Sequence, residues 1–101
     1  MMTLRRQAEF DNIHKHGKPV FLGFARVVIL PSSIGKCRYA IVTPKRLGNA
    51  VVRNRIRRRL RSALFLAGKG ISLDILIFPN IKAKNALYFD IQRAFTRLLA
   101  S

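Results

Sequence analysis

Residues 49–67 place apolar side chains along one face of a helix and mostly polar or basic side chains around the rest of it. The apolar positions recur at intervals of four, four, three and four residues: Val52, Ile56, Leu60, Ala63 and Ala67. This spacing follows the period of an α-helix, about 3.6 residues, and predicts a single core-facing stripe. Asn49 is suited to cap the N-terminus of the helix, and Gly68 and Gly70 are suited to end it.

The rest of the chain predicts an α+β fold. The expected elements are, in order, a helix over 6–16 that ends at Gly17, two strands within 19–30 divided at Gly23, a strand over 38–43, the helix just described, a strand over 72–78 and a helix over 86–100. The last helix is expected to bury Leu87, Ile91, Ala94, Phe95 and Leu98 on one face. The order α-β-β-β-α-β-α predicts one domain over residues 1–101, with a four-stranded mixed sheet packed with helices. The strand–helix–strand unit over 38–78 requires at least one parallel pair of strands.

Charge narrows the possible functions of such a domain. The chain of 101 residues has 20 Lys and Arg against 4 Asp and Glu, a formal net charge of +16, yet half of its residues are hydrophobic. An ordinary apolar content favours a folded domain with a strongly positive surface. Four acids leave little material for carboxylate chemistry or for a metal site, and no small-molecule substrate is expected.

Other classes of protein are also disfavoured. The longest stretch without a charged residue, 27–35, is too short to span a membrane and contains Pro31. The N-terminus lacks the apolar run of a secretory signal. The single cysteine, Cys37, allows neither an internal disulfide nor a cysteine-rich zinc site. These features predict a cytoplasmic protein with no membrane partner and no metal of its own.

The basic residues concentrate in one segment. Residues 45–61 hold eight basic side chains and no acid: Lys45, Arg46, Arg53, Arg55, Arg57, Arg58, Arg59 and Arg61. With Ile56 at the centre of the core-facing stripe, Arg58 points away from the core, and Arg55 and Arg57 lie on opposite sides of the helix. A helix face that is merely solvated normally mixes both signs of charge. A surface of arginines without acids is instead typical of a phosphate binder, because guanidinium groups bind phosphate with two parallel hydrogen bonds.

The sequence from Lys45 to Arg58, KRLGNAVVRNRIRR, resembles the R-N-R motif of the bacterial ribonuclease P protein subunit. Glu9-Phe10 with Ile13 and Gly17 resembles the first helix of that family, and residues 73–77 resemble its last strand, so the resemblance covers the whole chain. It implies a fold similar to the second domain of a small-subunit ribosomal protein, with a left-handed βαβ crossover. General preferences would instead favour a right-handed one.

The resemblance also implies a function. Members of the family assist a catalytic RNA that removes the 5′ leader of precursor tRNA, and the RNA holds the Mg²⁺ ions. The expected partners are therefore the ribonuclease P RNA and precursor tRNA. The positions that correspond to the RNA-docking residues of the family are Lys45, Arg46, Arg53, Asn54, Arg55, Arg57, Arg58 and Arg61.

A second surface follows from the same resemblance. In the family, the cleft between the first helix and the sheet receives the single-stranded leader. Phe10 matches an aromatic residue of this cleft, whereas His14 and Val28 stand where relatives often have aromatic residues. Phe21 and Phe24 lie in the same strand region and are candidates to replace them. The interpretation of the three phenylalanines as core residues stays open.

Three other functions are weighed against this one. A structural ribosomal protein or a general RNA-binding protein shares the charge and the fold, but the R-N-R spacing disfavours it. A metal-dependent nuclease needs a cluster of acids or histidines, and the four acids are scattered. His14 and His16 are two residues apart, so a helix would not let them act as an acid–base pair. A DNA-binding protein needs a base-reading helix, for which no pattern is present.

Overall fold

A five-stranded mixed sheet forms the middle layer of the molecule. The computed structural model describes residues 2–100. The elements are β1 (Met2–Thr3), α1 (Gln7–His16), β2 (Lys18–Phe21), β3 (Ala25–Pro31), β4 (Arg38–Ile41), the 3₁₀ turn η1 (Lys45–Leu47), α2 (Ala50–Ala67), β5 (Leu73–Pro79), the 3₁₀ turn η2 (Ile81–Lys84) and α3 (Tyr88–Ala100). The strand order is β1-β4-β5-β3-β2. α2 connects β4 to the neighbouring parallel strand β5, which confirms the predicted parallel pair.

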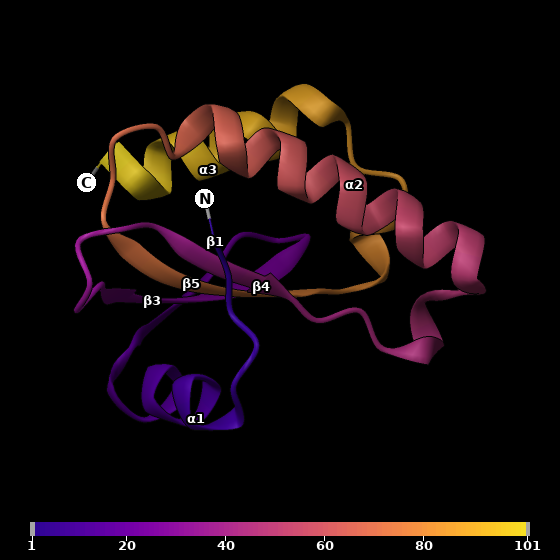
Figure 1. The fold of residues 1–101 in the computed structure, drawn as a ribbon. Coiled ribbons are helices and arrows are strands. Elements are labelled where there is room, and N and C mark those ends of the chain that lie inside the picture. Colours follow the sequence, from indigo (N-terminus) through magenta and orange to yellow (C-terminus); the bar gives the residue numbers. More distant parts are fainter. Residues whose placement is uncertain (1, 101) are drawn as a thin grey trace.

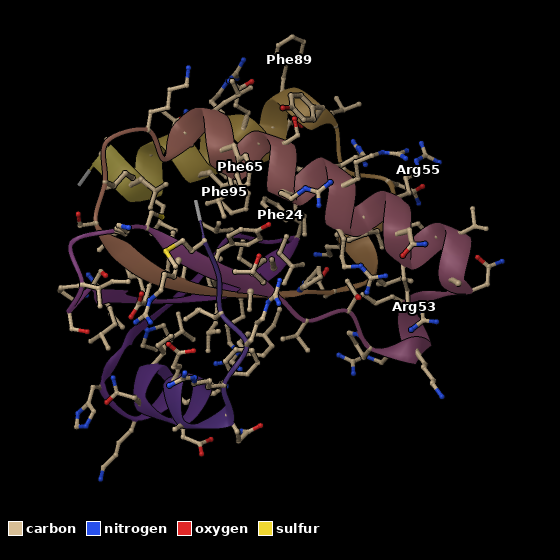
Figure 2. All side chains as sticks on the ribbon, in the orientation of Figure 1. Phe24, Arg53, Arg55, Phe65, Phe89 and Phe95 are labelled. Atoms are coloured by element: carbon tan, nitrogen blue, oxygen red, sulfur yellow. The ribbon has the colours of Figure 1, made fainter. Side chains whose placement is uncertain are left out.

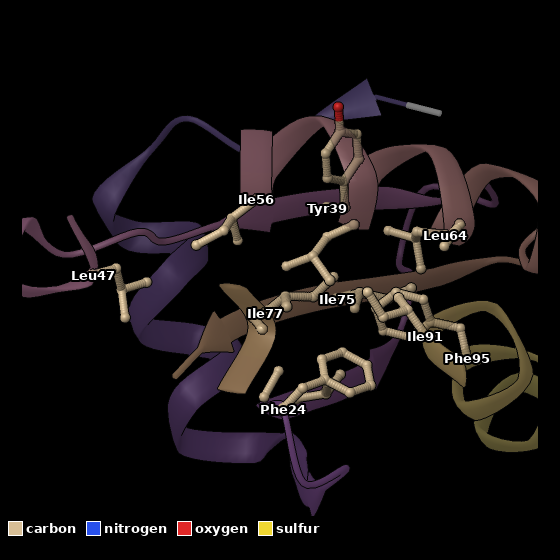
Figure 3. Packing of buried hydrophobic residues seen from close by; sticks show 14 of the residues in the cluster. Phe24, Tyr39, Leu47, Ile56, Leu64, Ile75, Ile77, Ile91 and Phe95 are labelled. Atoms are coloured by element: carbon tan, nitrogen blue, oxygen red, sulfur yellow. The ribbon is translucent and has the colours of Figure 1, made fainter. Parts of the chain in front are cut away.

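Helices cover both faces of this sheet, α2 and α3 on one and α1 on the other (Figure 1). Alternation along the central strands divides the core accordingly. Val27, Ile75 and Ile77 pack under α2 and α3, whereas Val28 and Leu76 pack against Ile13 of α1. Figure 3 shows part of the larger cluster, between the sheet and α2 and α3.

The core-facing stripe predicted for α2 is confirmed. Ile56, Leu60 and Ala63 are buried against the sheet, together with Leu64 on the adjoining side of the stripe. Val52 and Ala67, at the two ends, are half-buried and pack against the same cluster. The basic side chains of α2 are therefore held on a helix that is fixed along its length.

The sheet has one strand more than predicted. β1 pairs in parallel with β4, and the backbone N–H groups of Met2 and Leu4 donate to the carbonyl oxygens of Cys37 and Tyr39 at 3.0 and 2.7 Å. Both residues of β1 are exposed, so the strand has no apolar pattern that would reveal it. Its pairing covers the edge of β4 that would otherwise be free.

The last helix begins later than predicted, and Leu87 is not part of its buried face. The carbonyl oxygen of Leu87 accepts the N–H groups of Asp90 and Ile91, which places Leu87 before the first turn of α3. Its side chain points to solvent and is exposed, unlike those of Ile91 and Phe95.

Gly17 ends α1 as predicted, but for a steric reason. Its backbone is extended, with φ −78°, and its N–H donates to the carbonyl oxygen of Ile13 at 2.7 Å. A Cβ on Gly17 would lie 2.4 Å from that oxygen and 2.6 Å from Cγ1 of Val28. The missing side chain thus lets the end of α1 contact β3 directly.

We expect Gly17→Ala to destabilise the fold by about 1–3 kcal/mol, because a backbone atom and a buried side chain would both have to move. Urea unfolding followed by circular dichroism measures this loss. Gly35→Ala is the comparison, since nothing lies within 4 Å of its added Cβ and only its φ of +70° opposes the change. Wild-type stability of Gly17→Ala would contradict the steric explanation.

Candidate RNA interface

The loop before α2 fixes the N-terminus of this helix. Leu47 is buried, and Gly48 takes a φ of +138°, where an added Cβ would lie 3.0 Å from Cβ of Val52. The Asn49 side chain accepts the N–H of Val52 at 3.0 Å, which confirms the predicted cap. No acid lies in the first turn. The helix therefore presents the positive end of its dipole without a neutralising carboxylate.

The arginines of α2 occupy two flanks and a crest, and Arg61, predicted to point away from the core, lies toward the edge of the sheet. Figure 2 shows Arg53 on the side of η1 and Arg55 on the side of α3. Arg57 and Arg61 follow Arg53 at intervals of four residues, and we call these three residues the sheet-edge flank. Arg55 and Arg59 lie on the α3 side, and Asn54 and Arg58 are exposed along the crest between the two flanks.

Neutral acceptors orient two of these arginines. Nη1 of Arg57 donates to Oγ1 of Thr43 at 2.7 Å, and Nη2 of Arg57 donates to Oδ1 of Asn54. On the other side, Arg59 donates to the carbonyl oxygen of Ala86. These bonds fix the direction of the guanidinium groups without reducing their charge.

The acids of the chain lie elsewhere. In residues 2–100, both ion pairs involve Arg38, which binds Asp74 through two hydrogen bonds of 2.8 and 2.7 Å and also binds Glu9. The hydrogen bond to Asp74 raises the pKa of the Arg38 guanidinium above its usual value. Asp11 accepts from the side chain of Gln7 at 2.9 Å, and Asp90 lies in the first turn of α3. No carboxylate among these residues therefore pairs with an arginine of α2.

A concavity of about 420 Å³ lies on the α1 side of the sheet, beyond the area that α1 covers. Its lining comes from β2, β3, β5 and the loop before α2: Phe21, Arg26, Val42, Pro44, Arg46, Phe78, Pro79 and Asn80. The guanidinium carbon of Arg26 lies 4.6 Å from the centre of the Phe78 ring. The ring of His14 lies 5.2 Å from the same ring, on the side of α1. The concavity thus combines aromatic surface with two arginines.

Of the five residues predicted for the leader cleft, two lie at or beside the concavity, one is half-buried and two are buried. Phe21 lines the concavity and is 69% exposed, and His14 is an exposed neighbour of Phe78. Phe10 is half-buried and packs against the cluster of Ile13 and Leu76.

The structure corrects the predicted role of Phe24 and Val28 in leader binding. Both side chains are buried, and neither lines the concavity. Phe24 lies on the opposite face of the sheet, with its ring edge-on to Phe95 at 5.8 Å between centres. Val28 lies on the α1 face but is covered in the core beneath α1. The positive φ of +88° at Gly23 interrupts the strand between Phe21 and Phe24, so alternation does not carry across it.

Arg26 and Phe78 also line the concavity, although the sequence pattern did not predict them as site residues. The signal that could have found Arg26 is its position as the lone basic residue in the apolar strand 25–30, which marks the open part of one face. Phe78 is paired with Arg26 in the β3–β5 register, a contact that periodicity alone does not reveal.

Three other properties of the described residues bear on function: metal binding, thiol reactivity and membrane insertion. Residues 2–100 contain no group of three His, Cys, Asp or Glu side chains that could hold a metal ion. Burial raises the pKa of the Cys37 thiol, which disfavours the reactive thiolate. No helix between residues 2 and 100 is long and apolar enough to cross a membrane.

Comparisons with known proteins agree with this geometry. The family model described as Ribonuclease P matches residues 1–101. The ribonuclease P protein component of Staphylococcus haemolyticus is 31% identical over 95% of this chain and 85% of its own length. That of Carboxydothermus hydrogenoformans is 34% identical over 81% of this chain and 74% of its own length.

Solved structures show the same fold. The RNase P protein of Staphylococcus aureus superposes with a TM-score of 0.84 at 26% identity, covering 99% of this chain and 94% of that one. The RNase P protein of Thermotoga maritima has a TM-score of 0.81 at 24% identity, covering 98% of this chain and 96% of that one, and shares the fold.

Proposed function

Since the chain belongs to the ribonuclease P protein family and is a protein subunit of ribonuclease P, an enzyme of tRNA processing, we propose that it serves this enzyme through two RNA-binding surfaces. One is the basic surface of α2 with the loop before it, which docks on the catalytic RNA. The other is the concavity on the α1 side of the sheet, which holds the 5′ leader of precursor tRNA.

The basic surface of α2 and the loop before it, which contains no acid, supports the first part of the proposal. Its members are Lys45, Arg46, Arg53, Asn54, Arg55, Arg57, Arg58 and Arg61. Asn54 differs from the others because it has no charge, and its side chain holds Arg57 in place. Such a surface releases counterions when it binds phosphates, which supplies affinity that falls as salt rises.

The concavity has the chemistry of a single-strand binding surface. Aromatic side chains stack on bases of any identity, each contact contributing about 1–3 kcal/mol, and nearby arginines bind the backbone phosphates. Phe21 and Phe78 supply the rings, and Arg26 and Arg46 supply the charges. Arg46 also belongs to the basic loop before α2, so the two surfaces meet at this residue.

We assign catalysis to the partner RNA and to the Mg²⁺ ions that it holds. The protein contributes positive charge where the phosphates of two RNAs converge, and this reduces their repulsion. We place this work in the cytoplasm, where precursor tRNA is processed in bacteria.

Phe21→Ala tests the leader surface, because Phe21 is exposed and its loss leaves the core intact. We expect the affinity of the holoenzyme for precursor tRNA to fall about 5- to 150-fold, the equivalent of one lost stacking contact. The affinity for mature tRNA, which lacks the leader, should not change. Equilibrium binding of both tRNAs to the same holoenzyme gives the ratio.

Phe89→Ala is the matched control, since Phe89 is 73% exposed on α3 and lies outside the concavity. It should leave the precursor-to-mature ratio at the wild-type value. If Phe21→Ala leaves the precursor-to-mature ratio unchanged, the concavity does not bind the leader.

A further inference from the structure

A small groove separates the sheet-edge flank of α2 from the edge of the sheet. It has a volume of about 210 Å³ and is lined by Thr3, Tyr39, Ile41, Arg57 and Arg61. Thr3 and Tyr39 are paired residues of the parallel strands β1 and β4. The short strand β1 therefore contributes one wall of the groove, through Thr3.

The groove contains a hydroxyl group that the fold leaves unpaired. Tyr39 is 8% exposed, and its ring meets Phe65 edge-on at 5.6 Å between centres. Figure 3 shows its hydroxyl directed away from Ile75 and Ile77 of the core. This oxygen forms no hydrogen bond within residues 2–100 and is not one of the buried side-chain atoms there that lack a partner, so it is accessible from the groove.

Two arginines, Arg57 and Arg61, line the groove together with Tyr39. Thr43 and Asn54 fix Arg57 in its orientation, and Arg61 lies one turn further along the same flank. Thr3 adds a second hydroxyl from β1. Two cations and two neutral donors around one small space form a site for a tetrahedral oxyanion, since each phosphate oxygen accepts several hydrogen bonds.

We propose that this groove seats one backbone phosphate of the catalytic RNA, with Tyr39 as a neutral donor beside Arg57 and Arg61. The proposal rests on the proposed function of α2 as the docking helix. It adds that docking extends from the helix onto the edge of the sheet, where β1 and β4 present their hydroxyls.

Tyr39→Phe removes only the hydroxyl and retains the ring contact with Phe65. We expect the dissociation constant of the complex with ribonuclease P RNA to rise about tenfold, as for one lost hydrogen bond to a charged group. The dependence of log Kd on log salt should keep its slope because the hydroxyl is neutral, whereas Arg61→Gln should reduce that slope by about one. Thermal unfolding should be unchanged or slightly raised. A wild-type dissociation constant for Tyr39→Phe would overturn the proposal.

Tyr88→Phe is the matched control, because the hydroxyl of Tyr88 is already bonded to Ser62 at 2.9 Å on the other side of α2. Its dissociation constant should stay at the wild-type value. An equal loss of affinity in both variants would show that the effect is not specific to the groove, and would also overturn the proposal.

A direct reporter is available, since the chain has two tyrosines. In the Tyr88→Phe variant, 3-fluorotyrosine gives a single ¹⁹F signal, from residue 39. This signal should shift when ribonuclease P RNA is added, and a signal that stays unchanged in the saturated complex would contradict the proposed contact.

The phosphate seat and the docking helix can be tested separately. If simultaneous replacement of Arg53, Arg57 and Arg61 abolishes docking while Tyr39→Phe has no effect, the phosphate seat is wrong and the docking helix stands. If neither change weakens docking, the proposed function of α2 fails as well.

Discussion

Replacement of Arg53, Arg57 and Arg61 together by alanine is expected to weaken binding of the ribonuclease P RNA by about two to three orders of magnitude at low salt. The three side chains form the sheet-edge flank of α2, and no acid offsets their charge. Their loss should reduce the slope of log Kd against log salt by about three, so that the variant and the wild type converge as salt rises. Titration of labelled RNA at several salt concentrations measures both quantities.

A variant with the same net charge tests whether the affinity for RNA depends on the location of the three arginines or on the total charge of the protein. Replacement of the exposed residues Lys36, Lys69 and Arg93 by alanine removes the same three charges from outside α2. This variant should lose far less affinity than the flank variant. Equal losses in the two variants would mean that overall charge, and not the surface of α2, sets the affinity.

Packing under the same helix gives a second control. Ile56→Ala should cost roughly 2–5 kcal/mol of stability, because Ile56 is buried beneath α2, and should leave the arginines in place. Its affinity for the RNA should follow the folded fraction alone.

Arg38→Ala should cost about 3–5 kcal/mol of stability, because it leaves the buried carboxylate of Asp74 without its partner. Arg38 also binds Glu9 of α1, so its removal takes away the ion pair between this helix and β4 and leaves their apolar contacts in place. Urea unfolding gives the free energy of unfolding. A loss below about 1 kcal/mol would contradict the structural role of the cluster of Glu9, Arg38 and Asp74.

Replacing both Arg38 and Asp74 by apolar residues tests the same explanation, because it removes the two charges of the pair together. In Arg38→Met with Asp74→Leu, no buried charge is left unpaired, so much of the stability should return. Asp74→Leu alone should leave Arg38 with only Glu9, whose side chain is 27% exposed, and should fall between the two. A double variant as unstable as Arg38→Ala would show that the charges themselves are required.

The helix and strand pattern followed from local sequence where burial is periodic. The stripe of Ile56, Leu60 and Ala63 placed α2 correctly because a helix that packs along its whole length needs such a stripe. β1 was missed since its two exposed residues are held by backbone bonds to Cys37 and Tyr39, and these bonds leave no mark in the side-chain pattern.

The candidate sites were predictable to different degrees. The arginines of α2 are set by position along one helix, so their directions follow from the helical period alone. The concavity is assembled from β2, β3, β5 and a loop, and its lining depends on the strand register. Phe24 lies in the turn between β2 and β3, where Gly23 has a positive φ, and its burial on the face opposite α1 depends on the path of this turn.

Cleavage of precursor tRNA by the ribonuclease P RNA at low Mg²⁺ concentration shows whether the protein acts by docking on this RNA through α2. Four reactions are compared: RNA alone, RNA with the wild-type protein, RNA with the Arg53, Arg57 and Arg61 variant, and protein alone. The account predicts fast cleavage with the wild-type protein, slow cleavage with RNA alone or with the variant at the same concentration, and none with protein alone. Metal-dependent cleavage by the protein alone, or full activity of the variant, would contradict it.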